Sequence, residues 1–295
     1  MLAAYDSGMG RRGLKALLFG ASGQLGTAIS AACAATSDIE LTCVPRSVDI
    51  SDAAKVSASV ESERPQWVIN CAAMTNVDGA HENPALAIGV NALGPANIAR
   101  AAESVGARVI QISTEAVFDG ERTSAYAEDD ACNPVAVYGI SKLAGEMMVR
   151  LYNPLSFVLR TSWLYSSNSG VNFPTRLLQQ LNSHDGPVSV VTDVVGNPTP
   201  SAVLAEAVLA VIASPPEPGV YHACCVGAVT KFDWAVEIAR TGGFDPSRIV
   251  PVTSADYPTV ALRPKYVDLS CEKFLATGVY PLPNWQDAWT ASATG

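Results

Sequence analysis

The chain has 295 residues, of which 48% are hydrophobic and 16% charged, and its formal net charge is −9. This length and composition fit one large α/β domain, or a main domain with a smaller companion. The acidic balance argues against a nucleic-acid partner, because phosphate backbones are bound by basic patches. No apolar run approaches the roughly 20 residues that span a bilayer, so we expect no membrane partner.

The cysteines and histidines indicate neither a metal centre nor a disulfide framework. Seven cysteines and three histidines are scattered without a CxxC pair or a zinc-ligand spacing, so we predict no metal site. An odd number of cysteines without such a pattern favours a reduced, cytoplasmic protein. The N-terminal segment does not have the form of a secretory signal, and residues 1–13 are interpreted as a loose lead.

The first half of the chain alternates short apolar runs with helical segments. LKALLFG, IELTCV, QWVINCAA and ARVIQIS are typical of strands, and the stretches between them have helical composition, including the long NPALAIGVNALGPANIARAAESVG. This alternation predicts an α/β fold with a doubly wound parallel sheet covered on both faces. Ligands of such a sheet lie beyond the carboxyl ends of its strands.

The second half has a looser pattern. Short strand-like runs (VSVVTDV, GVYHACC, RIVPVT) mix with helical ones (TPSAVLAEAVLAVIAS, KFDWAVEIAR) and many prolines. We therefore predict a dinucleotide-binding domain over residues 1–160. Residues 161–295 are predicted to form mostly a smaller α/β substrate lobe, partly interleaved with the first domain.

A glycine motif directly follows the first predicted strand and opens a predicted helix. It reads Gly20-Ala-Ser22-Gly23-Gln24-Leu25-Gly26. Glycines at these places allow a tight turn and let the backbone approach a pyrophosphate at the helix N-terminus. The alternative is a glycine-rich surface turn, but the strand and helix on either side favour a dinucleotide site.

The end of the second predicted strand indicates which dinucleotide is bound. A site that prefers NADH usually has an acidic residue there, whereas this chain has Arg46, a cation suited to a 2′-phosphate. We therefore predict NADPH as the cofactor, with NADH as the alternative if Arg46 is only a solvated surface residue. Asp49 and Ile50 are predicted to border the adenine.

A set of three residues later in the chain has the chemistry of a ketone-reducing centre. Thr114 ends a predicted strand, and Tyr138 and Lys142 lie four positions apart, so both can reach one site from the same face of a helix. A neighbouring ammonium stabilises a phenolate, which lets the tyrosine exchange a proton with a carbonyl or alcohol. The lysine can also hold the nicotinamide ribose.

These motifs together resemble the extended short-chain dehydrogenase/reductases, which have a Rossmann fold, and within them the dTDP-4-dehydrorhamnose reductase family. The matching stretches include GASGQLG, VINCAAMTNVDGAHENPALAIGVNALGPANIARAA, ISTEAVFDG, NPVAVYGISKLAGE, LRTSWLYSSNSGVNF, VVTDVVGNPTP, GVYHACCVG and ALRPKYVDLS. The resemblance implies NAD(P)H-dependent reduction of the 4-keto group of a nucleotide-activated 6-deoxysugar. It also implies a homodimer.

Residue by residue, the resemblance assigns a role to each matching position. It makes Thr114, Tyr138 and Lys142 catalytic, and it implies that Trp163 stacks on the substrate's nucleobase, with core packing as the alternative role of that ring. It places Ala72, Ala73, Thr75 and Val77 along the cofactor, with Asn91 in the helix behind them, and it implies that Arg263 meets the substrate's diphosphate. Val77 and Asn172 are also substrate-site candidates.

The chain departs from the family pattern at positions expected to face the substrate. Glu115 and Ala116 replace an Asp-Tyr pair, Val195 replaces a glutamine, Val267 replaces a serine, and Met74 replaces an aromatic residue or histidine. Glu115, Ala116 and Val195 are kept as substrate-site candidates. Because lost hydrogen-bond partners change discrimination, we expect poor turnover of dTDP-4-dehydrorhamnose and better turnover of a related keto compound.

Two other functions remain compatible with the sequence. One is a non-catalytic, NADP-binding regulatory subunit of the same fold, which the complete set of Thr114, Tyr138 and Lys142 argues against. The other is a reductase or epimerase whose substrate is not a sugar nucleotide.

Overall fold

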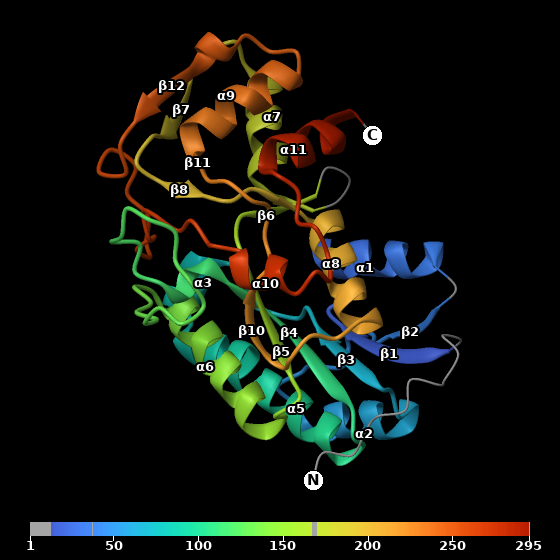
Figure 1. The fold of residues 1–295 in the computed structure, drawn as a ribbon. Coiled ribbons are helices and arrows are strands. Elements are labelled where there is room, and N and C mark those ends of the chain that lie inside the picture. The colour runs from blue at the N-terminus through green and yellow to red at the C-terminus, as the bar shows by residue number, and fades with distance from the viewer. Residues whose placement is uncertain (1–12, 37, 167–169, 295) are drawn as a thin grey trace.

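A six-stranded, fully parallel sheet forms the centre of the molecule (Figure 1). The computed structural model describes residues 13–36, 38–166 and 170–294, so nearly all of the predicted N-terminal lead lies outside it. The strand order is β10-β5-β4-β3-β1-β2, with the strand order reversing between β3 and β1. The strands are β1 (Leu14–Phe19), β2 (Ile39–Cys43), β3 (Trp67–Asn70), β4 (Arg108–Thr114), β5 (Phe157–Thr161) and β10 (Gly219–His222).

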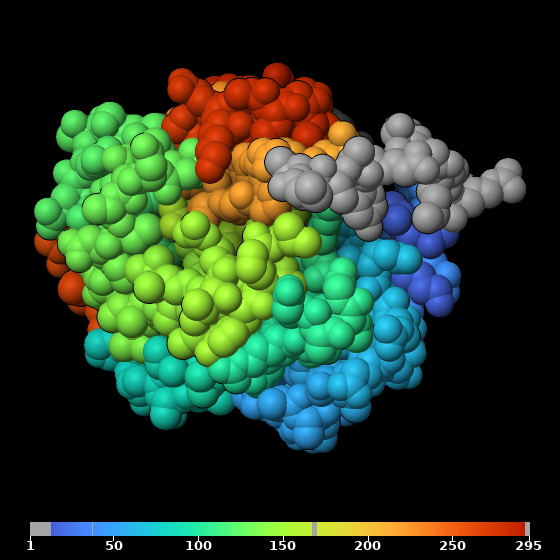
Figure 2. Space-filling view, turned by 60° about the horizontal axis from the view of Figure 1, so that its bottom comes forward, coloured from blue at the N-terminus to red at the C-terminus, as the bar shows by residue number. Residues whose placement is uncertain are grey.

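Helices cover both faces of this sheet, because its strands are apolar on both sides. Alternate side chains of β1 show this, since Leu18 packs in one hydrophobic cluster and Leu17 in the other. One face is covered by α1 (Gln24–Ala35), α8 (Ser201–Ala213) and α10 (Glu272–Ala276). The other is covered by α2 (Ala53–Glu63), α5 (Gly94–Ser104) and α6 (Val137–Tyr152), which lie side by side in Figure 2. The predicted doubly wound α/β fold is confirmed.

A smaller lobe lies at the carboxyl end of the sheet and has its own apolar core (Figure 1). Its strands form three two-stranded sheets, β7 with β12, β8 with β11, and β6 with β9. The helices are α7 (Phe173–Ser183), α9 (Lys231–Thr241) and α11 (Trp285–Thr294), with the turn η3 (Pro246–Arg248). The strands are β6 (Leu164–Tyr165), β7 (Val188–Val191), β8 (Val195–Gly196), β9 (Thr199–Pro200), β11 (Val229–Thr230) and β12 (Ile249–Val252).

The chain passes repeatedly between the sheet and this lobe. It leaves the sheet after β5, returns for α8 and β10, enters the lobe again for β11 to β12, and returns once more at α10 before α11. The lobe and the sheet domain therefore alternate along the chain. We use the word cleft for the boundary between them, which lies at the carboxyl ends of the strands (Figure 1).

The long helical segment predicted after β3 is divided by a π-helical turn. The segment comprises α3 (Val77–Glu82), α4 (Pro84–Ile88), the π turn η1 (Gly89–Leu93) and α5. The break has a local cause: Pro95 has no N–H to donate to the Asn91 carbonyl four residues earlier. That carbonyl instead lies against Gly145 of α6, where a Cβ would come within 2.2 Å of it. Such turns are common at functional sites.

Within the described residues, no helix has both the length and the apolar character needed to cross a membrane.

Candidate active site

The glycine loop between β1 and α1 needs two of its glycines for its own packing. Gly20 has φ +80°, and a Cβ there would stand 2.5 Å from the backbone nitrogen of Ala72. A Cβ on Gly26 would stand 2.2 Å from the Gly20 carbonyl oxygen. These glycines therefore let the turn close tightly and let α1 pack against it.

The third glycine has a different role, because nothing in the protein itself crowds it. The nearest atom to a Cβ on Gly23 would be the Gly20 carbonyl oxygen, at 3.4 Å. Gly23 is also the N-cap of α1 and provides no side-chain acceptor for the first turn. The amide donors at this helix start are therefore open to an external anion, which fits the pyrophosphate of a dinucleotide.

Other residues of the loop connect it to the core and to the lobe. Leu25 is buried, and Ser22 is exposed. The amide oxygen of Gln24 accepts a hydrogen bond from Asn172 Nδ2 (2.9 Å), which also donates to the Ser166 carbonyl (2.7 Å). Asn172 Oδ1 accepts from Thr175 N and caps α7. The whole amide of Asn172 is thus engaged within the protein, so it links the phosphate loop to the lobe.

The predicted adenine end lies beyond β2. Arg46 is exposed and makes no ion pair or hydrogen bond with the other described residues, so its guanidinium is free to meet a phosphate. Asp49 is exposed and accepts hydrogen bonds from Ser51 N and Oγ. Ile50 is buried against Gly94 of α5 and therefore packs as a core residue at this edge.

The loop after β3 is held by the π turn. Met74 N donates to Asn91 Oδ1 (2.8 Å), and Asn91 Nδ2 donates to the Met74 carbonyl and to Ser141 Oγ. Ser141 Oγ in turn donates to the Tyr138 carbonyl (2.7 Å). Asn91 thereby fixes this loop, which carries the half-exposed Ala72 and Ala73, the exposed Thr75 and the start of α3 at Val77, relative to α6.

The structure brings the three predicted catalytic residues together at the end of β4. Thr114 is the last residue of β4 and caps the short η2 helix (Glu115–Val117). The Thr114 hydroxyl lies close enough to the Tyr138 phenol to lower its pKa. Lys142 is buried and its Nζ donates to the Ile112 carbonyl at 2.7 Å, two residues before Thr114.

The electrostatics of this group follow from its burial. Burial raises the pKa of the Tyr138 phenol, and the nearby Glu115 carboxylate raises it further. Burial lowers the pKa of Lys142 to about 8, against the opposing charge of Glu146. A protonated phenol can donate a proton to a carbonyl oxygen, and Lys142 is still charged at neutral pH.

A buried ion pair behind Lys142 was not predicted from the sequence. Arg160 of β5 donates to Glu146 through Nη2 at 2.8 Å and through Nε, and both side chains are almost wholly inaccessible. Ser113 also donates a short hydrogen bond to Glu146. Glu146 follows Lys142 by four positions, so both lie on one face of α6. The pair joins β4, β5 and α6 and places a negative charge near the lysine.

At the substrate end, the residues that replace the family pattern have unequal positions. Glu115 is half-buried, and its Oε2 accepts a hydrogen bond from Thr114 Oγ1 at 2.8 Å. Burial raises the pKa of Glu115. Ala116 and Val195 are half-buried, but Val267 is 2% exposed and offers no surface to the cleft. The expectation that Val267 faces the substrate is therefore wrong, because its side chain packs in the interior.

Trp163 stands at the entry to the lobe in an unusual backbone conformation. Its φ is +39°, which is rare outside glycine. Its ring is half-buried and stacks on Trp234 with centroids 5.7 Å apart, and Gly196 leaves room for its edge. The ammonium of Lys231, which the sequence reasoning missed, lies 4.4 Å from the Trp163 ring centroid. Part of the ring surface of Trp163 is thus used for packing inside the protein.

Arg263 lies across the cleft on the segment before Val267. It forms an ion pair with Asp78 of α3 at 3.0 Å and donates to the Ala261 carbonyl at 2.9 Å. Asp78 also accepts from Ala261 N. The predicted phosphate-binding arginine is therefore engaged with an acidic partner that an incoming diphosphate would have to share or displace.

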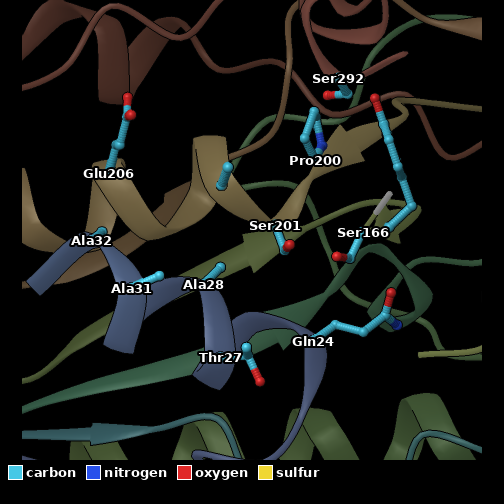
Figure 3. A pocket seen from close by; sticks show the side chains of 12 residues that line it. Gln24, Thr27, Ala28, Ala31, Ala32, Ser166, Pro200, Ser201, Glu206 and Ser292 are labelled. Carbon is cyan, nitrogen blue, oxygen red and sulfur yellow. The ribbon is translucent and has the colours of Figure 1, made fainter. Parts of the chain in front are cut away.

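A cavity of about 410 Å³ lies beside the glycine loop but outside the catalytic group. It opens between α1 and α8, with Gln24 and Thr27 on one side, Ser201 and Glu206 on the other, and Ser292 of α11 at its edge (Figure 3). None of the three catalytic candidates lines it. Across the residues that the structure describes, no cluster of His, Cys, Asp and Glu could hold a metal ion.

The sequence of this chain is similar to those of known proteins. A family model described as the RmlD substrate binding domain matches residues 14–294. A dTDP-4-dehydrorhamnose reductase of Mycobacterium tuberculosis (strain ATCC 25618 / H37Rv) is 39% identical over 284 residues, which are 95% of this chain and 92% of the relative.

Two solved structures are similar over almost the same extent. A dTDP-4-dehydrorhamnose reductase from Clostridium acetobutylicum superposes with a TM-score of 0.89 at 37% identity, covering 94% of this chain and 98% of the other. A dTDP-4-dehydrorhamnose reductase from Bacillus anthracis, solved in complex with NADP, also has a TM-score of 0.89, at 31% identity and with the same coverage.

Proposed function

Because this chain belongs to the RmlD substrate binding domain family, we propose that it is an NADPH-dependent oxidoreductase of the short-chain dehydrogenase/reductase type. It reduces the 4-keto group of a nucleotide-activated deoxysugar. The observation that carries the proposal is the meeting of Thr114, Tyr138 and Lys142 at the carboxyl end of β4. The complete set also favours an enzyme over a regulatory subunit.

The glycine loop and Arg46 support the cofactor assignment. The uncrowded Gly23 and the open amides at the start of α1 fit a pyrophosphate. The unpaired guanidinium of Arg46 fits a 2′-phosphate, which NADPH has and NADH lacks. The similar protein from Bacillus anthracis was solved with NADP. When bound, the cofactor supplies the hydride that the keto carbon accepts.

The protein's own residues supply the proton and the orientation. Tyr138 donates its phenolic proton to the keto oxygen as negative charge develops there. Lys142 is assigned the role of stabilising the resulting phenolate by its charge, which also suits the hydroxyls of the nicotinamide ribose. Thr114 lies close to the phenol at the end of β4 and lowers its pKa. Asn91 supports this arrangement from the π turn, through Ser141.

The nucleotide end of the substrate is assigned to the lobe side of the cleft. Trp163 presents a partly exposed aromatic surface there for the base. Arg263 contributes a guanidinium for the diphosphate, shared with Asp78. The substrate is therefore a small molecule bound between the sheet and the lobe.

The surface of α6 supports a homodimer. One side of this helix carries the exposed apolar residues Ile140, Met147 and Leu151. The π turn packs against α6, and its Leu93 is also exposed. Figure 2 shows α6 on the outer face of the molecule. Apolar side chains gathered on one helix are typical of an interface. Light scattering of the wild type and of Met147→Glu tests this, and a monomeric wild type would contradict it.

The cytoplasm is the proposed location. All seven cysteines are unpaired thiols in the structure, as is usual for proteins of a reducing compartment.

The direct test is a coupled assay with dTDP-4-dehydrorhamnose, followed by the loss of NADPH absorbance. NADPH oxidation that requires the keto sugar, and that Tyr138→Phe abolishes, would support the proposal. A kcat/KM of about 10⁴ M⁻¹s⁻¹ or more would contradict the expectation of a divergent sugar. No reduction of any dTDP-linked 4-keto sugar would contradict the function itself.

A further inference from the structure

Lys231 is a half-buried cation without a partner of its own. It is the first residue of α9, and its Nζ lies 4.4 Å from the ring centroid of Trp163 and 4.7 Å from that of Phe173. The ammonium makes no hydrogen bond or ion pair with the other described residues. Two aromatic faces hold the charge in place but leave its N–H donors unsatisfied.

The nearest acidic group is Glu115, which is only partly satisfied. One of its oxygens accepts the Thr114 hydroxyl at 2.8 Å. Glu115 and Lys231 each influence the pKa of the other through their charges. They do not form a direct ion pair, so their charged atoms are more than about 4 Å apart. An incompletely satisfied cation and an incompletely satisfied carboxylate therefore lie in one neighbourhood without a direct bond between them.

We propose that Glu115 and Lys231 together bind a hydroxyl group on the substrate carbon next to the keto carbon. This rests on the proposed function. A group that bonds both residues has to accept from the ammonium and donate to the carboxylate, and a hydroxyl does both. Its position follows from Glu115, which bonds Thr114 and lies near enough to Tyr138, the proton donor to the keto oxygen, to raise its pKa.

The pair makes the enzyme selective for a hydroxylated sugar over its deoxy counterpart. In a 4-keto-6-deoxyhexose, the neighbouring carbon that can carry this hydroxyl is C3. A substrate without it leaves a partly buried carboxylate and ammonium unpaired. Sites built to bond a substrate hydroxyl reject analogues that lack it far more strongly than apolar pockets reject a missing methylene.

Binding of the diphosphate is the competing role for Lys231. Arg263 is close enough to lower the pKa of Lys231, and two cations near each other suit a phosphate. The two roles predict different results. A phosphate contact is common to every nucleotide-linked sugar, so its loss weakens all of them equally, whereas loss of a hydroxyl contact affects only the sugar that has the hydroxyl.

The test compares two dTDP-linked 4-keto-6-deoxyhexoses, one with a hydroxyl at C3 and one without. We measure kcat/KM for both with the wild type, Lys231→Met, Lys231→Arg and Glu115→Gln. The wild type is expected to favour the hydroxylated sugar by about 100-fold or more. Lys231→Met, which keeps contact with the two rings, and Glu115→Gln are expected to reduce that ratio to roughly tenfold or less. Lys231→Arg keeps the positive charge and should retain part of the wild-type ratio of kcat/KM values.

Lys273→Met is the matched control. Lys273 also lies over an aromatic ring, that of Tyr221 at 4.6 Å, but it is on α10 and donates to the Val220 carbonyl outside the cleft. Its substitution should leave the ratio unchanged. A wild-type ratio near one overturns the proposal. A fall of equal size for both sugars in Lys231→Met also overturns it, and assigns the lysine to the diphosphate.

A second readout separates this inference from the proposed function. The affinity of both sugars for Tyr138→Phe loaded with NADPH is measured by calorimetry, where no turnover is needed. Tighter binding of the hydroxylated sugar, lost in the double variant with Lys231→Met, supports the inference even if neither sugar is reduced by the wild type. Absence of reduction then contradicts the proposed function alone, whereas equal affinities contradict the inference.

Discussion

Gly139 lies so close to the carbonyl oxygen of Ala116 that a Cβ at position 139 would stand 2.1 Å from it. This contact lets the first turn of α6 approach the η2 helix and brings Tyr138, the next residue back, to Thr114. Only a glycine at position 139 allows this close approach.

Gly139→Ala is therefore expected to separate the phenol from Thr114. The backbone clash should cost about 1–3 kcal/mol of stability, and ketone reduction should fall with it. Urea unfolding and steady-state kinetics measure the two effects. Gly89→Ala is the control, because nothing lies within 4 Å of its Cβ position in a helical segment. Unchanged kinetics in Gly139→Ala would show that the contact is not needed.

Tyr138→Phe should lower kcat by roughly 10²- to 10⁴-fold, because only the proton donor is removed. NADPH affinity, measured by fluorescence titration, should not change. Tyr152→Phe at the far end of the same helix is the control and should keep the wild-type rate. If Tyr138→Phe remains active, another group protonates the keto oxygen.

Arg46→Ala should remove the preference for NADPH over NADH. Loss of a charge-assisted contact to the 2′-phosphate costs about 1.5–3 kcal/mol, which is roughly 10- to 100-fold in affinity. Titration of both cofactors with the wild type and the variant measures it. Lys55→Ala, on the nearby α2 surface and paired with Asp52, should keep the preference. Equal wild-type affinities for the two cofactors would make Arg46 a surface residue.

Glu146→Gln should destabilise the fold strongly, because it leaves the buried Arg160 charge without its partner. Breaking such a pair costs about 3–5 kcal/mol. Glu237→Gln breaks an ion pair with Arg240 that is largely exposed, and it should cost less than about 1 kcal/mol. Denaturant unfolding of both variants gives the comparison. A similar cost for both would mean that burial adds nothing to the Glu146 pair.

The rate of ketone reduction should fall as pH rises through about 8. The pKa of Lys142 is lowered to about 8 by burial, so its ammonium, the form that stabilises the phenolate, is present below that pH and lost above it. Lys231 has a pKa that burial also lowers to about 8, so the profile is measured in Lys231→Met as well. The alkaline limb should persist there, and its disappearance would assign it to Lys231.

The lowered pKa of Lys142 affects stability in the opposite direction from the reaction rate. Unfolded Lys142 titrates near 10.5, so between pH 8 and 10.5 the unfolded chain binds more protons than the folded one. This group's contribution to the free energy of unfolding therefore increases with pH across that window.

The parallel sheet and the grouping of the candidate catalytic residues could be predicted from local sequence, because each depends on a short pattern. The apolar runs of β1 to β4 and the glycine loop read directly as strand, turn and helix. Tyr138 and Lys142 are related by helical spacing alone. Their meeting with Thr114 follows from the rule that ligands lie at the carboxyl ends of parallel strands.

Residues defined by tertiary contact could not be found in this way. Lys231 stands in the cleft only because α9 begins beside Trp163. Asn172 reads as a substrate residue in sequence, but its amide is used by Gln24 and the α7 cap. Val267 differs from the family pattern yet packs in the interior. Burial and partners of this kind depend on segments far apart in the chain.

The repeated crossing of the chain between sheet and lobe limits how the protein can be re-engineered. The lobe is built from three separate segments, which follow β5, follow β10 and follow α10. A substrate-recognition module of this kind cannot be exchanged with a relative as a single cassette, because one continuous graft would carry α8 and β10 with it and replace part of the sheet. Chimeras would need three coordinated junctions, and changes of specificity are more readily made by point substitutions in the cleft.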